Sequence, residues 1–228
     1  GHAQYGVVPV ENSTEGAVGR SMDLLLATPL KICGEVVLRI HQNLLTNEAD
    51  LSKITKVYSH AQSLAQCHEW LNHNLPGIPR ISVSSNSLAA QLVTQEVGVA
   101  AIAGVAAAER FNLPKLAENI EDEPNNTTRF LVLGKHDAAP SGRDKTSLIM
   151  SAQNRTGALH ELLLPFSHAG VSLSRLESRP ARHALWEYVF YVDIDGHRDE
   201  PAVKAALDEL ASRAAYLKIL GSYPVAVY

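Results

Sequence analysis

The chain has 228 residues, of which 46% are hydrophobic and 19% are charged, and this balance supports one large folded domain or two smaller ones. The formal net charge of −4 and the lack of a basic stretch with interleaved aromatic residues argue against a nucleic-acid-binding surface. No apolar run is long enough to cross a bilayer and no signal-peptide pattern opens the chain, so we expect a soluble, cytoplasmic protein that acts on a small molecule.

The two cysteines and the first residues add two expectations. Cys33 and Cys67 lie far apart without metal-site or redox spacing, so we expect core thiols in a reducing compartment and no metal or cofactor. The segment 1–4 lacks an initiating Met and leads at once into a buried-strand pattern at 5–10. We therefore expect that an upstream part of the fold is missing from this sequence.

The first element is a strand at 5–10, and a polar turn at 11–16 separates it from a helix. The helix has an apolar side formed by Val18, Met22, Leu25 and Leu26. Such strand-to-helix junctions present backbone N–H groups and side-chain hydroxyls that suit an anionic ligand. Asn12, Ser13 and Thr14 are candidates for ligand contacts, and capping of the following helix is the alternative for each of them.

The middle of the chain alternates strands with helices. The stretch 32–45 is long and rich in β-branched residues, and we expect it to cross between two lobes as an extended strand. Further strands are expected at 54–59, 80–83 and 99–103, and helices are expected around Cys67, from Leu88 to Glu96 and up to Phe111. This alternation predicts an α/β class with ligand-facing loops at one edge of the sheet. His60 follows the strand at 54–59, where open α/β sheets place ligands, although a structural role is the alternative.

The stretch Asn125-Asn126-Thr127-Thr128-Arg129-Phe130 runs into the apolar segment 131–134. The asparagines behind Pro124 predict a turn and the following residues predict a buried strand. We therefore expect Thr128 and Arg129 at a loop-to-strand junction, from which a hydroxyl and a guanidinium can be aimed into a cleft.

A linker at 135–143 separates this part from a second domain, and we expect domains at 1–138 and 144–228. The elements expected after the linker are a strand at 147–151, a helix at 157–168, strands at 171–178 and 186–194, a helix at 201–214 and a strand at 217–227. This βαββαβ order is the ferredoxin-like arrangement.

Ordered motifs in both domains carry a family resemblance. They are Pro9-Val10-Glu11-Asn12-Ser13 with Gly16, Ser59-His60, Thr128-Arg129-Phe130, Gly157-Ala158-Leu159 and Glu177-Ser178-Arg179-Pro180. In this order and across nearly the whole chain, they resemble prephenate dehydratase with a C-terminal ACT regulatory domain. The resemblance implies a catalytic domain of two α/β lobes, similar to the periplasmic binding fold, with the active site in the cleft between the lobes.

The resemblance also implies an activity and a set of catalytic-domain residues. The family converts prephenate to phenylpyruvate without a metal or cofactor, on the route to phenylalanine. Thr128 matches the catalytic threonine, and Arg129 matches an arginine that either pairs with a substrate carboxylate or braces the cleft. The implied substrate-binding residues are Asn12, Ser13, His60, Ser85, Ser87 and Phe130. Glu11 is expected to hold its loop.

In the ACT domain, the resemblance implies binding of phenylalanine as an inhibitory effector at an interface between paired chains. The matching residues are Gly157, Ala158, Leu159, Glu177, Ser178, Arg179 and Pro180. A homodimer or homotetramer is implied, and the parent protein can also carry an upstream chorismate mutase domain. The alternative function is a sensor that binds amino acids through the same cleft and ACT domain and catalyses nothing.

Overall fold

The chain divides into two compact units. The computed structural model describes residues 3–153, 155–181 and 188–226. The first unit consists of Gly1–Leu38 and Thr128–Tyr228, and the second is the intervening segment Arg39–Thr127. This division differs from the expected ranges 1–138 and 144–228 because the N-terminal strands share a core with the C-terminal sheet. Those ranges stay a prediction.

The first unit contains a four-stranded sheet in the order β2-β1-β9-β3. Its strands are β1 (Gly6–Asn12), β2 (Gly16–Ala17), β3 (Lys31–Arg39) and β9 (Thr127–Gly134), and helix α1 (Gly19–Ala27) follows β2. In the antiparallel pair of β1 and β9, Asn12 lies opposite Thr128 and Glu11 opposite Arg129. Strand β9 begins at Thr127, so Thr128 and Arg129 lie at the start of a paired strand, next to the loop before it, as we expected.

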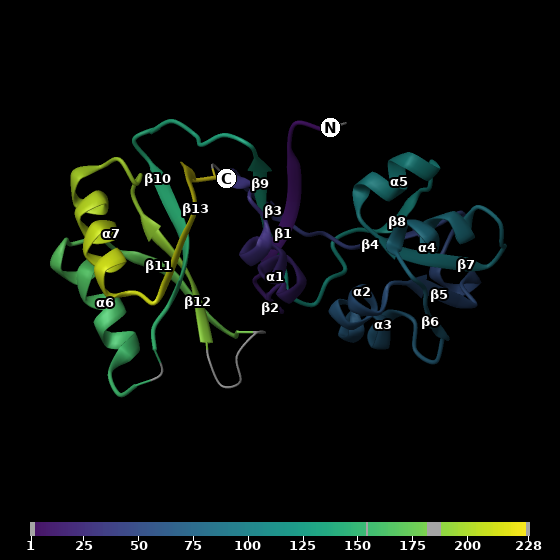
Figure 1. Ribbon diagram of the computed structural model, residues 1–228. Helices are drawn as coiled ribbons and strands as arrows, with labels where there is room; N and C mark the ends of the chain where they lie inside the picture. The colour runs from purple at the N-terminus through teal and green to yellow at the C-terminus, as the bar shows by residue number, and fades with distance from the viewer. Residues whose placement is uncertain (1–2, 154, 182–187, 227–228) are drawn as a thin grey trace. The chain divides into compact units, whose positions relative to one another are not determined.

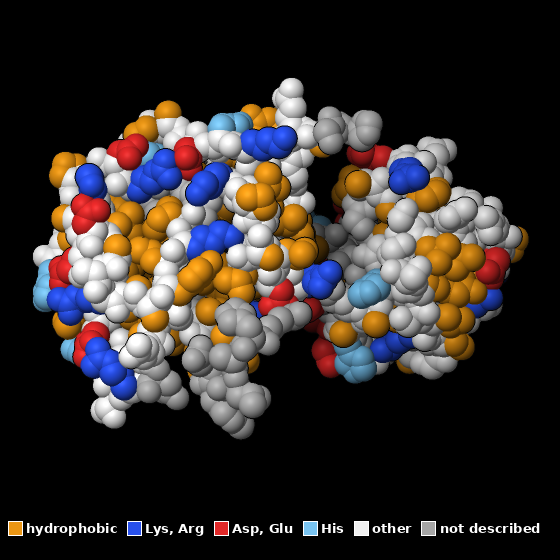
Figure 2. All heavy atoms as spheres, viewed as in Figure 1, with side chains coloured by type: hydrophobic (Ala, Val, Ile, Leu, Met, Phe, Trp, Pro, Cys, Tyr) orange, Lys and Arg blue, Asp and Glu red, His pale blue; other side chains and the backbone are white. Residues whose placement is uncertain are grey.

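The remainder of the first unit has the expected βαββαβ order, which confirms the ferredoxin-like arrangement. Its elements are β10 (Asp144–Ser151), α6 (Ala158–His168), β11 (Leu173–Pro180), β12 (Tyr188–Asp195), α7 (Pro201–Arg213) and β13 (Tyr216–Pro224). The sheet order is β11-β12-β10-β13, and α6 and α7 lie side by side on one face (Figure 1). Acidic and basic side chains are interspersed over the surface of this domain that is in view in Figure 2. Parts of the expected strands at 186–194 and 217–227 lie outside the described residues.

The other face of this second sheet packs against β1, β9 and α1. The shared core includes Val10, Met22, Leu131, Ile149, Tyr191 and Tyr223, all of which are buried. Burial of apolar area of this kind is the main stabilising contribution in folding. The strand that carries Thr128 and the C-terminal sheet therefore belong to one packed body.

Gly221 lies where β13 approaches β3 most closely. A Cβ atom at this position would be 2.1 Å from the carbonyl oxygen of Ile32 and 2.9 Å from its nitrogen. We expect Gly221→Ala to lower the free energy of unfolding by about 2–3 kcal/mol, because two backbone segments must separate to admit a methyl group. Gly6→Ala is the control, since a Cβ there has no neighbour within 4 Å. Equal urea midpoints for the two variants would contradict the assigned contact.

The second unit is the α/β body that the alternation predicts. Its elements are β4 (Asn43–Thr46), η1 (Leu51–Lys53), β5 (Lys56–Ser59), α2 (Ala61–Gln66), α3 (His68–Asn74), β6 (Arg80–Ser82), α4 (Asn86–Val93), β7 (Val99–Ala103), α5 (Val105–Phe111) and β8 (Lys115–Ala117). The sheet order is β6-β5-β7-β4-β8. Strand β5 is parallel to β6 and β7, so the carboxyl ends of these three strands share one edge.

Three details differ from the sequence-based expectations. The stretch 32–45 passes between the units as two strands, because the backbone nitrogens of Ile40 and Gln42 bond to Asn126 and Glu121 instead of to a strand. The expected helix around Cys67 is two helices, α2 and α3, that meet at this residue. Strand β8 was not expected, because three residues are too few for a periodic signal.

Cys67 is a core thiol, as we expected. Its side chain is fully buried among the apolar residues of the second unit. Burial, together with the nearby carboxylates of Asp122 and Glu121, raises the pKa of this thiol to about 12. The thiol therefore stays protonated near neutral pH. None of the described helices combines the length and the apolar character needed to span a membrane.

Candidate functional site

Thr128 and Asn12 form a buried hydrogen-bonded pair. The side-chain nitrogen of Asn12 donates to the hydroxyl oxygen of Thr128 at 2.9 Å. The side-chain oxygen of Asn12 accepts from the backbone nitrogens of Thr14 at 3.0 Å and Glu15 at 3.1 Å. Asn12 therefore fixes the turn between β1 and β2 and positions the Thr128 hydroxyl at the same time.

The turn residues do not cap helix α1. The helix begins at Gly19, and its N-cap residue is Val18, which makes no side-chain capping bond. The alternative role of Asn12, Ser13 or Thr14 as a cap of this helix is therefore wrong. The polar side chains of the turn serve other partners, and Ser13 itself is exposed.

The Thr128 hydroxyl has the right environment to act as a donor. A hydroxyl that accepts a bond from an amide nitrogen keeps its own proton for an acceptor in another direction. Among the described residues, no acceptor for that proton is present. Phe130, two residues further along β9, projects from the same face of the sheet and is half-buried.

Arg129 projects from the opposite face, toward the C-terminal sheet. Its Nε donates to Glu35 at 2.7 Å, one terminal nitrogen donates to Asp193 at 2.6 Å, and the other donates to the Tyr223 hydroxyl at 2.9 Å. Burial alone would lower the pKa of this guanidinium, but Asp193, Tyr223 and Glu35 raise it above its ordinary value. All three guanidinium nitrogens of Arg129 donate to side chains of the first unit. This geometry therefore favours a role in bracing the structure over a contact with substrate.

Further charges surround Arg129. Lys145 contacts Glu35 at 3.3 Å, and Arg175 contacts Glu11 at 3.2 Å, while Arg129 lies 3.8 Å from Glu11. The cluster thus holds three cations and three carboxylates, contributed by β1, β3, β9, β10, β11 and β12. Glu11 is held by cations of its own unit, in line with the role expected for it.

In the second unit, the candidate residues lie at the carboxyl edge of the parallel strands. His60 follows β5 and caps α2, because its ring nitrogen accepts from the backbone nitrogen of Gln62 at 3.3 Å. Ser85 caps α4 by accepting from the backbone nitrogen of Leu88 at 3.1 Å. His60, Ser85 and Ser87 are all exposed, so each can still meet a ligand at this edge.

Asn86 connects these residues, and the sequence reasoning missed it. Its side-chain oxygen accepts from the Ser59 hydroxyl at 2.9 Å and from the backbone nitrogen of His60 at 3.0 Å. Its side-chain nitrogen donates to the Ser63 hydroxyl at 2.9 Å. The polar run 84–87 after β6 was the available signal, but its spacing does not show which member turns toward β5.

The candidate effector residues fall on two separate elements of the C-terminal domain. Gly157, with φ of 78°, precedes α6, and Ala158 and Leu159 open that helix. The segment 177–180 lies on β11, the edge strand of the sheet. Within the described part of the chain, no hydrogen bond or ion pair joins the two segments.

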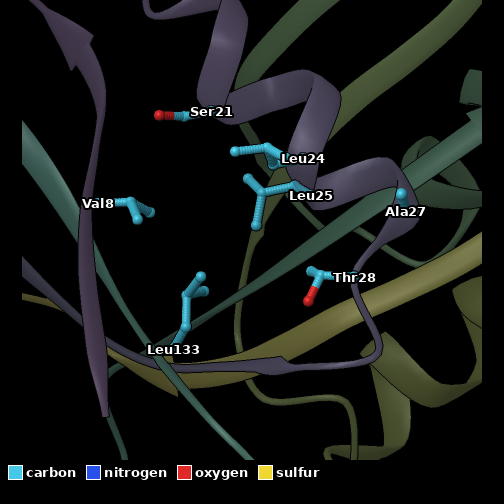
Figure 3. A pocket seen from close by; sticks show the side chains of 7 residues that line it. All are labelled: Val8, Ser21, Leu24, Leu25, Ala27, Thr28 and Leu133. Atoms are coloured by element: carbon cyan, nitrogen blue, oxygen red, sulfur yellow. The ribbon is translucent and has the colours of Figure 1, made fainter. Parts of the chain in front are cut away.

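An apolar cavity of about 370 Å³ lies between α1 and the strands β1 and β9. Figure 3 shows Leu24 and Leu25 of α1 opposite Val8 and Leu133, with the hydroxyl of Ser21 near one end. Val8 lies opposite Leu131 in the strand pair, so this cavity is on the face that Arg129 shares and Thr128 does not. Its lining suits an apolar group and not a dianion.

Family models match two ranges of this chain. A model described as prephenate dehydratase matches residues 1–138, and one described as ACT domain matches residues 146–212. A bifunctional chorismate mutase/prephenate dehydratase from Neisseria gonorrhoeae is 56% identical over 99% of this chain and 63% of its own length. This chain therefore spans less than two thirds of that relative.

Two solved structures are similar to this chain over nearly its whole length. A prephenate dehydratase from Arthrobacter aurescens, solved in complex with L-Phe, is 33% identical with a TM-score of 0.88 and covers 98% of this chain and 76% of its own. A structure described as a quorum quenching acylase is 30% identical with a TM-score of 0.86 and covers 98% of this chain and 82% of its own. Since the dehydratase model matches more than half of the residues, the chain belongs to the prephenate dehydratase family, with an ACT domain after the dehydratase region.

Proposed function

We propose that this protein converts prephenate to phenylpyruvate. The observation that carries the proposal is the buried Asn12–Thr128 pair, which aims a hydroxyl from a rigid strand in a chain of the dehydratase family. A module that only bound a ligand would not require a preoriented donor at this position. The protein is accordingly a carbon–oxygen lyase of phenylalanine biosynthesis.

The reaction removes a carboxylate and a hydroxyl from the prephenate ring. The ring carboxylate leaves as carbon dioxide, its bonding electrons enter the ring, and the hydroxyl departs with a proton as water. A free threonine hydroxyl is a very weak acid, so Thr128 acts by donating a hydrogen bond to the departing oxygen. The proton that completes the water comes from solvent, and aromatisation supplies most of the driving force.

Substrate binding is assigned to polar and aromatic groups on β9, in and next to the turn after β1, and at the carboxyl edge of the parallel strands. In the first unit these are Asn12, Ser13 and Phe130, and in the second they are His60, Ser85 and Ser87. Hydroxyl and imidazole donors hold carboxylates through directed hydrogen bonds. Arg129 positions the strand that carries Thr128 and does not itself touch substrate.

Phenylalanine is proposed as the effector of the ACT domain. The related Arthrobacter protein was solved with L-Phe, which supports this ligand class. Gly157, Ala158, Leu159 and the segment 177–180 are proposed to bind it together at an interface of paired chains, in a homodimer or homotetramer. The bifunctional relatives support a chorismate mutase region in the parent protein, and a cytoplasmic location fits a biosynthetic role.

The test is direct. The full-length protein is incubated with prephenate, and phenylpyruvate is quantified by chromatography over time. We expect steady formation of phenylpyruvate, and we expect added phenylalanine to slow it. Binding of prephenate or phenylalanine without any product above the uncatalysed rate would instead support the non-catalytic sensor and end this proposal.

A further inference from the structure

Helix α1 is held by three strands of the ACT sheet through side chains that reach across the shared core. Tyr191 of β12 donates from its hydroxyl to the carbonyl of Met22 at 2.7 Å. Lys218 of β13 donates to the carbonyls of Leu25, Leu26 and Thr28 at 3.0, 2.8 and 2.7 Å, which satisfies the C-terminal end of the helix. From β11, Arg179 contacts Asp23 at 3.2 Å.

The contact from β11 differs from the other two because it joins two charged groups. Arg179 and Asp23 are both partly exposed, with 25% and 18% of their side-chain areas accessible. The Nε of Arg179 is buried and, among the described residues, has no hydrogen-bond partner. The guanidinium therefore has an unused donor, and it can present this donor to a further anionic group only by changing its geometry toward Asp23.

Helix α1 is connected to the Thr128 hydroxyl through the turn that precedes the helix. The turn that Asn12 organises precedes it, and the backbone nitrogen of Val18, its N-cap, donates to the carbonyl of Val10 at 2.9 Å. Asn12 in turn donates to Thr128. A shift of α1 along or about its axis would thus act on the residue that positions the hydroxyl.

We propose that Asp23 is the residue through which the ACT domain signals to the catalytic strand. The effector's carboxylate forms an ion pair with Arg179, and this changes the geometry of the ion pair between Arg179 and Asp23. Helix α1 then repositions the turn that Asn12 fixes. This mechanism rests on the proposed function, since it deepens the regulation of that site. A ligand shifts an equilibrium only through contacts that differ between two states. The Arg179–Asp23 pair is a contact that an anionic effector can change directly.

Gly19 offers a second way to disturb the same pair. A Cβ at this position would lie 3.0 and 3.1 Å from the two terminal nitrogens of Arg179. Gly19→Ala therefore displaces the guanidinium without altering any charge. Asp23→Asn does the reverse, because it removes the charge and keeps the shape.

The experiment compares the full chain with Asp23→Asn, Gly19→Ala and the control Asp208→Asn. Asp208 pairs with Lys204 at 3.0 Å on the exposed side of α7, so its loss tests for a general effect of removing a surface carboxylate. Each protein is assayed for phenylpyruvate formation at increasing phenylalanine concentrations, and phenylalanine binding is measured separately by calorimetry. Amide hydrogen exchange of α1 is followed with and without phenylalanine.

We expect Asp23→Asn and Gly19→Ala to turn over prephenate and to bind phenylalanine, while half-inhibition shifts to a concentration about 5- to 150-fold higher. The control should behave as the wild type. Inhibition of both variants at the wild-type concentration would overturn the proposal. If the wild type forms no phenylpyruvate, the proposed function fails, and amide hydrogen exchange of α1 alone tests the inference. A phenylalanine-dependent change in the exchange rates of α1 that both variants lose supports the inference. Unchanged exchange rates of α1 in the wild type overturn it.

Discussion

Thr128→Ala is expected to lower kcat by about 10²–10³-fold, which is the usual loss when a single preplaced hydrogen-bond donor is removed from a reacting oxygen. The substitution deletes the hydroxyl that Asn12 orients but leaves the strand pairing of β1 and β9 intact. Because the interaction is made mainly in the transition state, KM should change little. Steady-state formation of phenylpyruvate measures both constants.

Two further variants separate chemistry from structure. Thr128→Ser keeps the hydroxyl and should retain much more activity than the alanine variant. Thr127→Ala removes a neighbouring hydroxyl that bonds to the Asn125 carbonyl at 3.0 Å, and it should leave kcat near the wild-type value. Near-normal turnover of Thr128→Ala, or an equal loss in Thr127→Ala, would remove Thr128 from its role.

Arg129→Met is expected to have the largest effect on stability. Glu35, Asp193 and Arg129 have only 1%, 8% and 12% of their side-chain areas exposed, so removal of the cation leaves buried carboxylates without their main partner. Breaking a buried pair from one side costs about 3–5 kcal/mol, because the remaining charge is neither solvated nor compensated. Urea unfolding of the variant measures this loss.

The matched control is Arg155→Met. Arg155 pairs with Glu161, but its side chain is 60% exposed, and exposed pairs contribute about 0–1 kcal/mol. Adding Asp193→Asn to Arg129→Met should recover part of the stability, since one orphaned charge disappears. If Arg129 instead bound substrate, the variant would show a raised KM with wild-type stability, and the brace would be excluded.

The elements of this fold were predictable where a local pattern was strong. The alternating strands and helices of the second unit and the βαββαβ order after residue 144 follow from short-range periodicity and turn residues. Residues 40–42 show the limit of such patterns. They look like a continued strand, but tertiary bonds to Glu121 and Asn126 end it.

The candidate site shows the same limit. Thr128 stood out from its position before an apolar run, but the role of Arg129 could not be decided from the sequence. Its partners Glu35, Asp193 and Tyr223 are 94, 64 and 94 positions away, and no spacing rule connects them. Asn86 was missed for a similar reason, because its importance comes from Ser59 and Ser63 on neighbouring elements.

The core shared by β1, β9, α1 and the C-terminal sheet has a consequence for how such a chain can be divided. Val10, Leu131 and Ile149 lie in one apolar cluster, although the dehydratase model covers the first two and the ACT model covers Ile149. Cutting the polypeptide at residue 140 would expose apolar surface on both fragments. The dehydratase region and the ACT region therefore depend on each other for a complete core, so neither is a self-sufficient module that could be exchanged for another at the linker.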